Sequence, residues 1–149
     1  MPYRPGASNQ RRGIVDWLVR WGPVLAWMLI IFVLSSQPSL PRAPSDALDV
    51  ALKKLGHGMG YAVLAVLLCR ALDACGRGLT DREGYVRAGL AVAVAFVYAV
   101  TDEIHQSFVP GRGPSPVDVC IDLMGALIGT SAYVLRSRSQ RGVPDTRLC

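Results

Sequence analysis

The residues best suited to chemistry lie in short polar clusters, each at the end of a long apolar run. The densest cluster follows the run AVAVAFVYAV and contains Asp102, Glu103, His105 and Gln106. Helical spacing places Asp102 and His105 on one face, and Glu103 and Gln106 on the neighbouring face. Carboxylate and imidazole groups at this spacing suit proton transfer or metal binding. A helix end in contact with water is the ordinary alternative.

A second cluster begins another apolar run. Lys54, His57, Tyr61 and Leu64 are spaced by three, four and three residues, so they share one helical face. The ordinary explanation is that Lys54 extends to the membrane interface and that Tyr61 belongs to an aromatic belt.

A third cluster combines a helix start with two aspartates. Ser115 has the position of an N-cap, and Asp118, three residues later, has the spacing of a capping box. Asp122 lies one turn deeper on the same face as Gly125 and Gly129. Because two small residues spaced by four allow another helix to come close, this face is expected to point into a helical bundle.

Arg112 precedes this cluster in the segment PGRGPSP. Its guanidinium group suits a phosphate or a carboxylate. The competing interpretation is a salt bridge to Asp118 or Asp122 that only closes the loop.

These clusters hold four carboxylates against only two permanently basic side chains, Lys54 and Arg112, which leaves an excess of negative charge when both histidines are neutral. One bound divalent metal ion would remove the excess, and its candidate ligands are His105, Asp102 and Asp122. Protonation of the histidines or of a deep carboxylate, or access of water, would also remove it.

The elements that must position these residues are four apolar runs in a chain of 149 residues with 51% hydrophobic and 18% charged residues. Each run approaches the roughly 20 residues of a membrane-spanning helix. A soluble chain of this size could not bury four helices that are apolar all round. The sequence therefore predicts an all-α integral membrane bundle of four transmembrane helices. The expected spans are approximately 17–36, 57–73, 87–105 and 117–135, within a membrane domain 17–135 flanked by basic tails 1–16 and 136–149.

The basic residues predict the orientation. Twelve of the 16 Lys and Arg residues lie in the two tails, in the loop between the second and third spans, or at the adjoining span ends. The positive-inside rule then places both termini in the cytoplasm and all the polar clusters at the outer face. This distribution along apolar runs also argues against a nucleic-acid partner, despite the net charge of +5.

Taken in order, the clusters resemble the VanZ-like family of small membrane proteins over roughly residues 30–130. The matching motifs are Ser35-Ser36-Gln37, Lys54-x2-His57-x3-Tyr61-x2-Leu64, Asp102-Glu103-x-His105-Gln106-x-Phe108-x-Pro110-x-Arg112 and Ser115-x2-Asp118-x3-Asp122-x2-Gly125-x3-Gly129. The resemblance implies a multi-pass protein of the bacterial cytoplasmic membrane. The family takes its name from a member linked to low-level resistance to the lipoglycopeptide teicoplanin.

Three functions are compatible with these residues. In the first, an outer polar cleft binds an anionic amphiphile, such as a phospholipid, a wall-precursor lipid or a lipoglycopeptide. Its expected binding residues are Lys54, Tyr61, Gln106, Arg112, Ser115 and Asp118. In the second, the protein is a membrane-embedded hydrolase or transferase of a lipid-linked substrate, with or without a metal ion. Its expected catalytic residues are His57, Asp102, Glu103, His105 and Asp122. In the third, the polar network only joins the helix ends.

Overall fold

The computed structural model describes residues 7–38, 45–73 and 82–141. They form four α-helices and, within these ranges, no strand: α1 (Ala7–Ser35), α2 (Asp46–Leu72), α3 (Arg82–Gln106) and α4 (Pro116–Arg141). All four helices are long and apolar enough to cross a membrane. The predicted all-α bundle of four membrane-spanning helices is therefore confirmed, and α1 and α4 extend beyond the expected span limits into the predicted tails. Residues 1–6 and 142–149 of those tails lie outside the described part.

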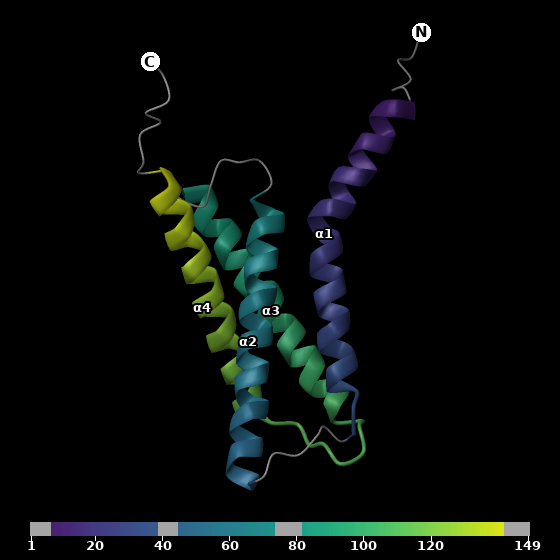
Figure 1. The fold of residues 1–149 in the computed structure, drawn as a ribbon, viewed down its shortest axis with the longest axis vertical. Coiled ribbons are helices and arrows are strands. Elements are labelled where there is room, and N and C mark those ends of the chain that lie inside the picture. Colours follow the sequence, from purple (N-terminus) through teal and green to yellow (C-terminus); the bar gives the residue numbers. More distant parts are fainter. Residues whose placement is uncertain (1–6, 39–44, 74–81, 142–149) are drawn as a thin grey trace.

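The helices run alternately up and down, so the N-terminal end of α1 and the C-terminal end of α4 lie at the same end of the bundle (Figure 1). Helices α2 and α4 form the most extensive interface, and α3 packs against both. Helix α1 contacts α2 and α3, and its N-terminal part leans away from the other helices (Figure 1). The ends opposite the termini converge, and there the functional candidates meet.

Helix α2 begins eleven residues before the expected start at His57. Ser45 is its N-cap, with its hydroxyl oxygen 3.4 Å from the backbone N–H of Leu48, and Lys53 pairs with Asp49 at 2.7 Å in the first turns. The expectation that Lys54 and His57 open the second span is therefore wrong. A good N-cap and an i,i+4 ion pair extend the helix through polar residues that hydropathy alone does not assign to a span.

Helix α1 continues through Pro23, which has no N–H to donate to the carbonyl of Val19 one turn earlier. The Nη2 atom of Arg70 in α2 donates to that carbonyl at 3.0 Å. A basic side chain of the neighbouring helix thus replaces the hydrogen bond that the proline removes.

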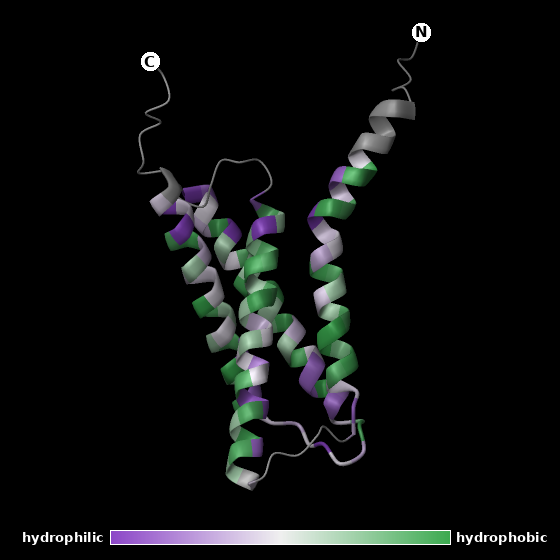
Figure 2. Ribbon diagram, in the orientation of Figure 1, coloured by the Kyte–Doolittle hydropathy of each residue, from purple (hydrophilic) through white to green (hydrophobic). Residues whose placement is uncertain are grey.

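The outward surface is apolar, as expected of a bundle in lipid. Large side chains such as Leu29, Val97 and Ile128 are 61–63% exposed. Figure 2 shows apolar residues along the lengths of the helices and hydrophilic ones concentrated toward their ends. The interior uses small residues instead: Ala91, Ala95 and Ala99 of α3 are fully buried. Small residues inside and large apolar residues outside are the distribution expected of a helical bundle surrounded by lipid.

The interface of α2 and α4 is a seam of close backbone contacts. A Cβ atom added at Gly125 would overlap the backbone carbonyl of Gly58, and one at Gly129 would overlap that of Ala62. The predicted approach of another helix at Gly125 and Gly129 is confirmed, and the partner is α2. Since the contact is between backbones, it sets the register of every side-chain pair across this interface.

Candidate functional site at the polar end of the bundle

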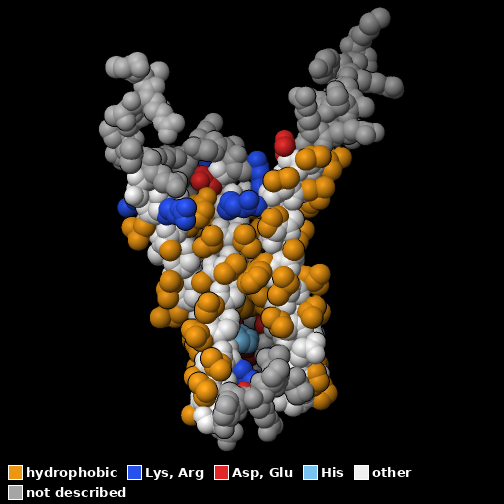
Figure 3. Space-filling view, in the orientation of Figure 1, with side chains coloured by type: hydrophobic (Ala, Val, Ile, Leu, Met, Phe, Trp, Pro, Cys, Tyr) orange, Lys and Arg blue, Asp and Glu red, His pale blue; other side chains and the backbone are white. Residues whose placement is uncertain are grey.

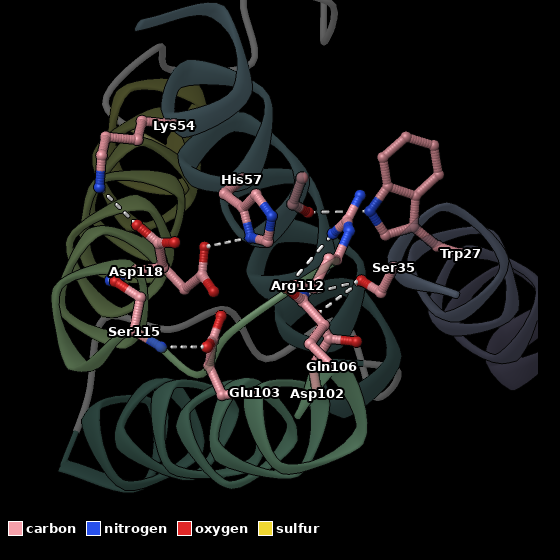
Figure 4. Close-up of polar contacts among 12 residues, drawn as sticks. Trp27, Ser35, Lys54, His57, Asp102, Glu103, Gln106, Arg112, Ser115 and Asp118 are labelled. Atoms are coloured by element: carbon pink, nitrogen blue, oxygen red, sulfur yellow. Dashed lines mark hydrogen bonds and ion pairs between the residues drawn. The ribbon is translucent and has the colours of Figure 1, made fainter. Parts of the chain in front are cut away.

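The polar ends of all four helices meet at one end of the bundle, as the sequence predicted. The C-terminal ends of α1 and α3 and the N-terminal parts of α2 and α4 provide the residues (Figures 1 and 4). Asp102, Glu103, Gln106 and Asp122 are buried there, with 1–5% of their surface exposed. These side chains are unusual for a small bundle because burying charge or an amide is costly without partners.

Helices α2 and α4 are joined by two acid–base pairs. Lys54 Nζ lies 2.6 Å from Asp118 Oδ1, and both side chains are partly exposed. One turn deeper, His57 Nδ1 lies 3.5 Å from Asp122 Oδ1. The His57 side chain is 21% exposed, whereas that of Asp122 is completely buried. Figure 4 shows His57 beside the Lys54–Asp118 pair. The site thus has a partly accessible imidazole backed by an inaccessible carboxylate.

The start of α4 is capped by Ser115, which directly precedes it, and by Glu103 of α3. The hydroxyl of Ser115 accepts from the backbone N–H of Asp118 at 3.3 Å, which confirms the predicted N-cap. The backbone N–H of Ser115 does not donate to the Asp118 side chain, however. It donates to Glu103 Oε2 of α3 at 2.7 Å. The capping-box interpretation of Asp118 is therefore wrong, because Glu103 takes that role from the adjacent helix and leaves Asp118 to Lys54.

A second network joins α3 to α1 and to the loop before α4. Asp102 Oδ2 accepts from the Ser35 hydroxyl at 2.8 Å and from Gln106 Nε2 at 3.0 Å. Gln106 Oε1 in turn accepts from Arg112 Nη1 at 3.2 Å, and Arg112 Nη2 lies 3.5 Å from the carbonyl of Leu34. Arg112 makes no salt bridge with Asp118 or Asp122 within the described ranges, so the loop-closing interpretation is wrong.

His105 faces α1 and not the buried carboxylates. Its Nε2 atom hydrogen-bonds the Ser36 hydroxyl at 3.0 Å, and its ring stacks on Phe32 with 4.4 Å between ring centres. In residues 7–38, 45–73 and 82–141, no group of three His, Cys, Asp or Glu side chains is arranged to hold a metal ion. The structure therefore does not bring the candidate ligands His105, Asp102 and Asp122 together.

Several buried polar atoms of the site lack a hydrogen-bond partner among the described residues. They are Asp102 Oδ1, Glu103 Oε1, both carboxylate oxygens of Asp122 and the hydroxyl of Tyr61. Buried polar groups in proteins are nearly always hydrogen-bonded, and exceptions concentrate at functional sites. The described residues therefore leave several buried acceptors of the site without a donor, and a bound hydrogen-bond donor would satisfy them.

A family model described as VanZ/LLP1 matches residues 17–137, which is most of the chain and includes all of the polar site. The chain belongs to the VanZ/LLP1 family. No curated protein and no solved structure matches it. The predicted VanZ-like resemblance is thus confirmed. Together with the four apolar helices, membership of the VanZ/LLP1 family describes a multi-pass membrane protein.

The sequence did not reveal two parts of the site, the contact of Trp27 with α2 and a groove between α2 and α4. Trp27 of α1 donates from Nε1 to the carbonyl of Gly60 at 2.8 Å, and so holds α1 to α2 near the site. The only available signal was an indole N–H in an apolar run, since a buried donor needs an acceptor. Ser35 was recognised only as part of a motif, although it bonds to the buried Asp102.

The second part is an apolar groove of about 490 Å³ on the outer side of the α2–α4 interface. Lys54 is its only charged residue, and the remaining lining residues are Leu55, Gly58, Met59, Ala62, Ile121, Met124, Gly125 and Ile128. The groove exists because small residues bring α2 and α4 together between rows of larger side chains. No linear pattern signals it, since it arises only from the pairing of the two helices.

Proposed function

We propose that this VanZ/LLP1 membrane protein binds an anionic amphiphile at the polar end of the bundle. The amphiphile is a phospholipid, a wall-precursor lipid or a lipoglycopeptide of the teicoplanin type. The observation that carries the proposal is the apolar groove between α2 and α4, which has Lys54 at its polar end. An acyl chain in the groove would place an anionic headgroup beside that ammonium group.

The two basic side chains differ in what they offer an anion. Lys54 is 37% exposed and already bonded to Asp118, so it would share its charge between that carboxylate and the headgroup. Arg112 has only the neutral oxygens of Gln106 and Leu34 as described partners. Its guanidinium charge is therefore available to a phosphate, with the fork geometry that suits one. In Figure 4, His57 lies between Lys54 and Arg112.

The site is further proposed to face the extracytoplasmic side of a bacterial cytoplasmic membrane. Figure 3 shows Lys and Arg side chains gathered at the end of the bundle opposite the polar site. The described basic residues of that end are Arg20, Arg70, Arg82, Arg87, Arg136 and Arg138. By the positive-inside rule this end is cytoplasmic, which leaves the site at the outer leaflet.

The binding proposal is tested by removing each basic side chain of the site, with the neighbouring Lys53 as the control. Native mass spectrometry would measure phosphatidylglycerol binding to the detergent-purified wild type and to Lys54→Ala, Arg112→Ala and Lys53→Ala. We expect about a tenfold weaker Kd for each of the first two, since each removes one charge-assisted contact. Lys53→Ala is the control, because Lys53 pairs with Asp49 on another face. Wild-type affinity in folded Lys54→Ala and Arg112→Ala would refute the proposal.

The groove is tested by filling it. Met124→Trp places a large ring among the lining residues, whereas Leu127→Trp, three residues later, places one on an exposed surface outside the groove. We expect Met124→Trp alone to lower the occupancy by phosphatidylglycerol. Equal occupancy in the two variants would exclude the groove as the acyl-chain site.

A second candidate function is supported by the His57–Asp122 pair. A partly exposed imidazole whose Nδ1 atom faces a buried carboxylate is the arrangement of a general base held in one orientation. With Arg112 as an anion clamp, it would suit hydrolysis or transfer on a lipid-linked phosphate substrate.

The enzyme is tested by headgroup release from phosphatidylglycerol and phosphate release from a polyprenyl diphosphate. If the protein turns over either substrate, His57→Gln and Asp122→Asn should abolish the release without abolishing binding. His105→Gln should retain it, because His105 faces α1. No release by the wild type, or turnover unaffected by His57→Gln, would rule out the assigned roles.

A further inference from the structure

We propose that Asp102, Glu103 and Asp122, with the Tyr61 hydroxyl, form a subsite for a hydrogen-bond donor on the lipid headgroup. The donor is an ammonium or hydroxyl group that the headgroup carries beyond its phosphate. This inference rests on the proposed function and specifies which lipids the site prefers. It is carried by the buried acceptor atoms of the site, and not by the basic side chains.

Each of the three carboxylates is held in place and still has a free oxygen. Ser35 and Gln106 both donate to Oδ2 of Asp102 and leave its Oδ1 unpartnered. The backbone N–H of Ser115 donates to Oε2 of Glu103 and leaves its Oε1 unpartnered. The oxygens of Asp122 have only the 3.5 Å approach of His57. The side chains are thus oriented by the fold, while buried acceptor atoms remain without a hydrogen bond from the described residues.

Tyr61 supplies an independent observation. Its side chain is 1% exposed, its hydroxyl has no described partner, and it lies one turn beyond His57 on the same face of α2. Its ring centre lies 6.2 Å from that of Tyr98 in α3, and Asp102 follows Tyr98 by one turn of that helix. A buried hydroxyl without a described partner can both donate and accept a hydrogen bond, so it adds a further unsatisfied group to the three carboxylates.

The missing donors are not available from the described parts of the chain. Lys54 is bonded to Asp118, and Arg112 donates to Gln106 and Leu34. Carboxylate oxygens accept strong hydrogen bonds from ammonium and hydroxyl groups, so a headgroup bearing one of these is the complementary ligand.

Helical geometry connects this subsite to the groove. From Lys54, the groove residues Gly58 and Ala62 follow at four and eight positions, whereas His57 and Tyr61 follow at three and seven. Because a turn takes 3.6 residues, Gly58 and Ala62 lie to one side of the direction of Lys54, and His57 and Tyr61 lie to the other. A phosphate at Lys54 therefore lies at the border between the groove and the carboxylates. Figure 3 shows histidine and acidic side chains in a hollow among the apolar ones near this end.

The experiment compares three lipids with identical acyl chains: phosphatidic acid, phosphatidylglycerol and phosphatidylethanolamine. Their phosphates carry, respectively, no further group, hydroxyls and an ammonium. Native mass spectrometry of the full-length protein would measure the Kd of each. We expect phosphatidylglycerol or phosphatidylethanolamine, or both, to bind about tenfold more tightly than phosphatidic acid. Whichever binds more tightly identifies the donor, and a Kd for phosphatidic acid equal to or below both others would overturn the subsite.

Variants show whether the preference arises in the subsite. Asp122→Asn and Tyr61→Phe should bring the favoured lipid close to the affinity of phosphatidic acid. Tyr61→Phe keeps the buried ring and removes only a hydroxyl without a described partner, so its folding should be intact. Glu83→Gln is the control, because Glu83 is exposed and pairs with Arg87 at the opposite end of the bundle. A preference that persists in Asp122→Asn and Tyr61→Phe would overturn the assignment.

The failure of the subsite differs from the failure of the proposed function. If phosphatidic acid binds and loses affinity in Lys54→Ala, but no lipid is preferred, only the donor subsite is wrong. If none of the three lipids binds, or if Lys54→Ala binds all of them as the wild type does, the proposed function is wrong and the subsite with it.

Discussion

The substitution Gly125→Ala tests the physical basis of the site, because the pairing of α2 and α4 positions its basic and acidic residues. The added methyl group would overlap the backbone carbonyl of Gly58, and a backbone atom has no rotamer into which it can move away. The two helices must therefore separate locally. Separation would stretch the two pairs that lie between this contact and the polar end of the bundle, Lys54 with Asp118 and His57 with Asp122.

The expected magnitude combines two opposing effects. Overpacking a tight interface typically costs about 1–3 kcal/mol, and a collision with backbone is expected at or above the upper end of that range. Alanine in place of glycine inside a helix returns about 1 kcal/mol through helix propensity. The net loss is about 2 kcal/mol of the free energy of unfolding, which corresponds to a fall in Tm of roughly 4–8 °C.

The assay is thermal unfolding in detergent followed by tryptophan fluorescence, because Trp27 contacts α2 through Gly60. Gly60→Ala is the matched control: nothing lies within 4 Å of its added Cβ. Gly58→Ala is intermediate, since its nearest atom is a methyl carbon of Ile121 at 3.3 Å. The expected order of Tm values is Gly60→Ala above Gly58→Ala above Gly125→Ala. The reasoning would be refuted if Gly125→Ala unfolded at or above the temperature of Gly60→Ala.

Three further expectations follow from single contacts. Ser35→Ala should lower the unfolding free energy by about 1–2 kcal/mol, because it removes a donor to the buried Asp102, and denaturation in detergent checks this. Glu103→Gln should cost roughly 1 kcal/mol by the same measurement, since the backbone N–H of α4 then donates to a neutral oxygen; an unchanged value would contradict the cap. In a variant without native cysteines, an impermeant maleimide should label Gly113→Cys in intact cells and Ser139→Cys only after lysis, and the opposite pattern would invert the proposed orientation.

Local patterns in the sequence determined much of this fold. Hydropathy identified the four spans, because each apolar run has the length that a bilayer requires. The position of Ser115 predicted its N-cap, which depends only on the residues that follow it. The spacing of Gly125 and Gly129 identified a face where another helix packs. The order of the polar clusters also predicted that they lie together. Consecutive spans run in opposite directions, so the ends of α1 and α3 lie on the same side as the starts of α2 and α4.

The partners within the site were decided only by the tertiary structure. The sequence offered Arg112 as the partner of Asp118, but the register of α2 on α4 brings Lys54 there. It placed Asp102 and His105 on one face, yet Asp102 bonds to Ser35 at the end of α1 and His105 to Ser36 just after that helix. Glu103 caps a helix to which it does not belong, and the groove lies between two helices. Helical periodicity assigns a residue to a face of its own helix. Which face meets which is set by the rotation and separation of the packed helices, and these depend on contacts between residues far apart in the chain.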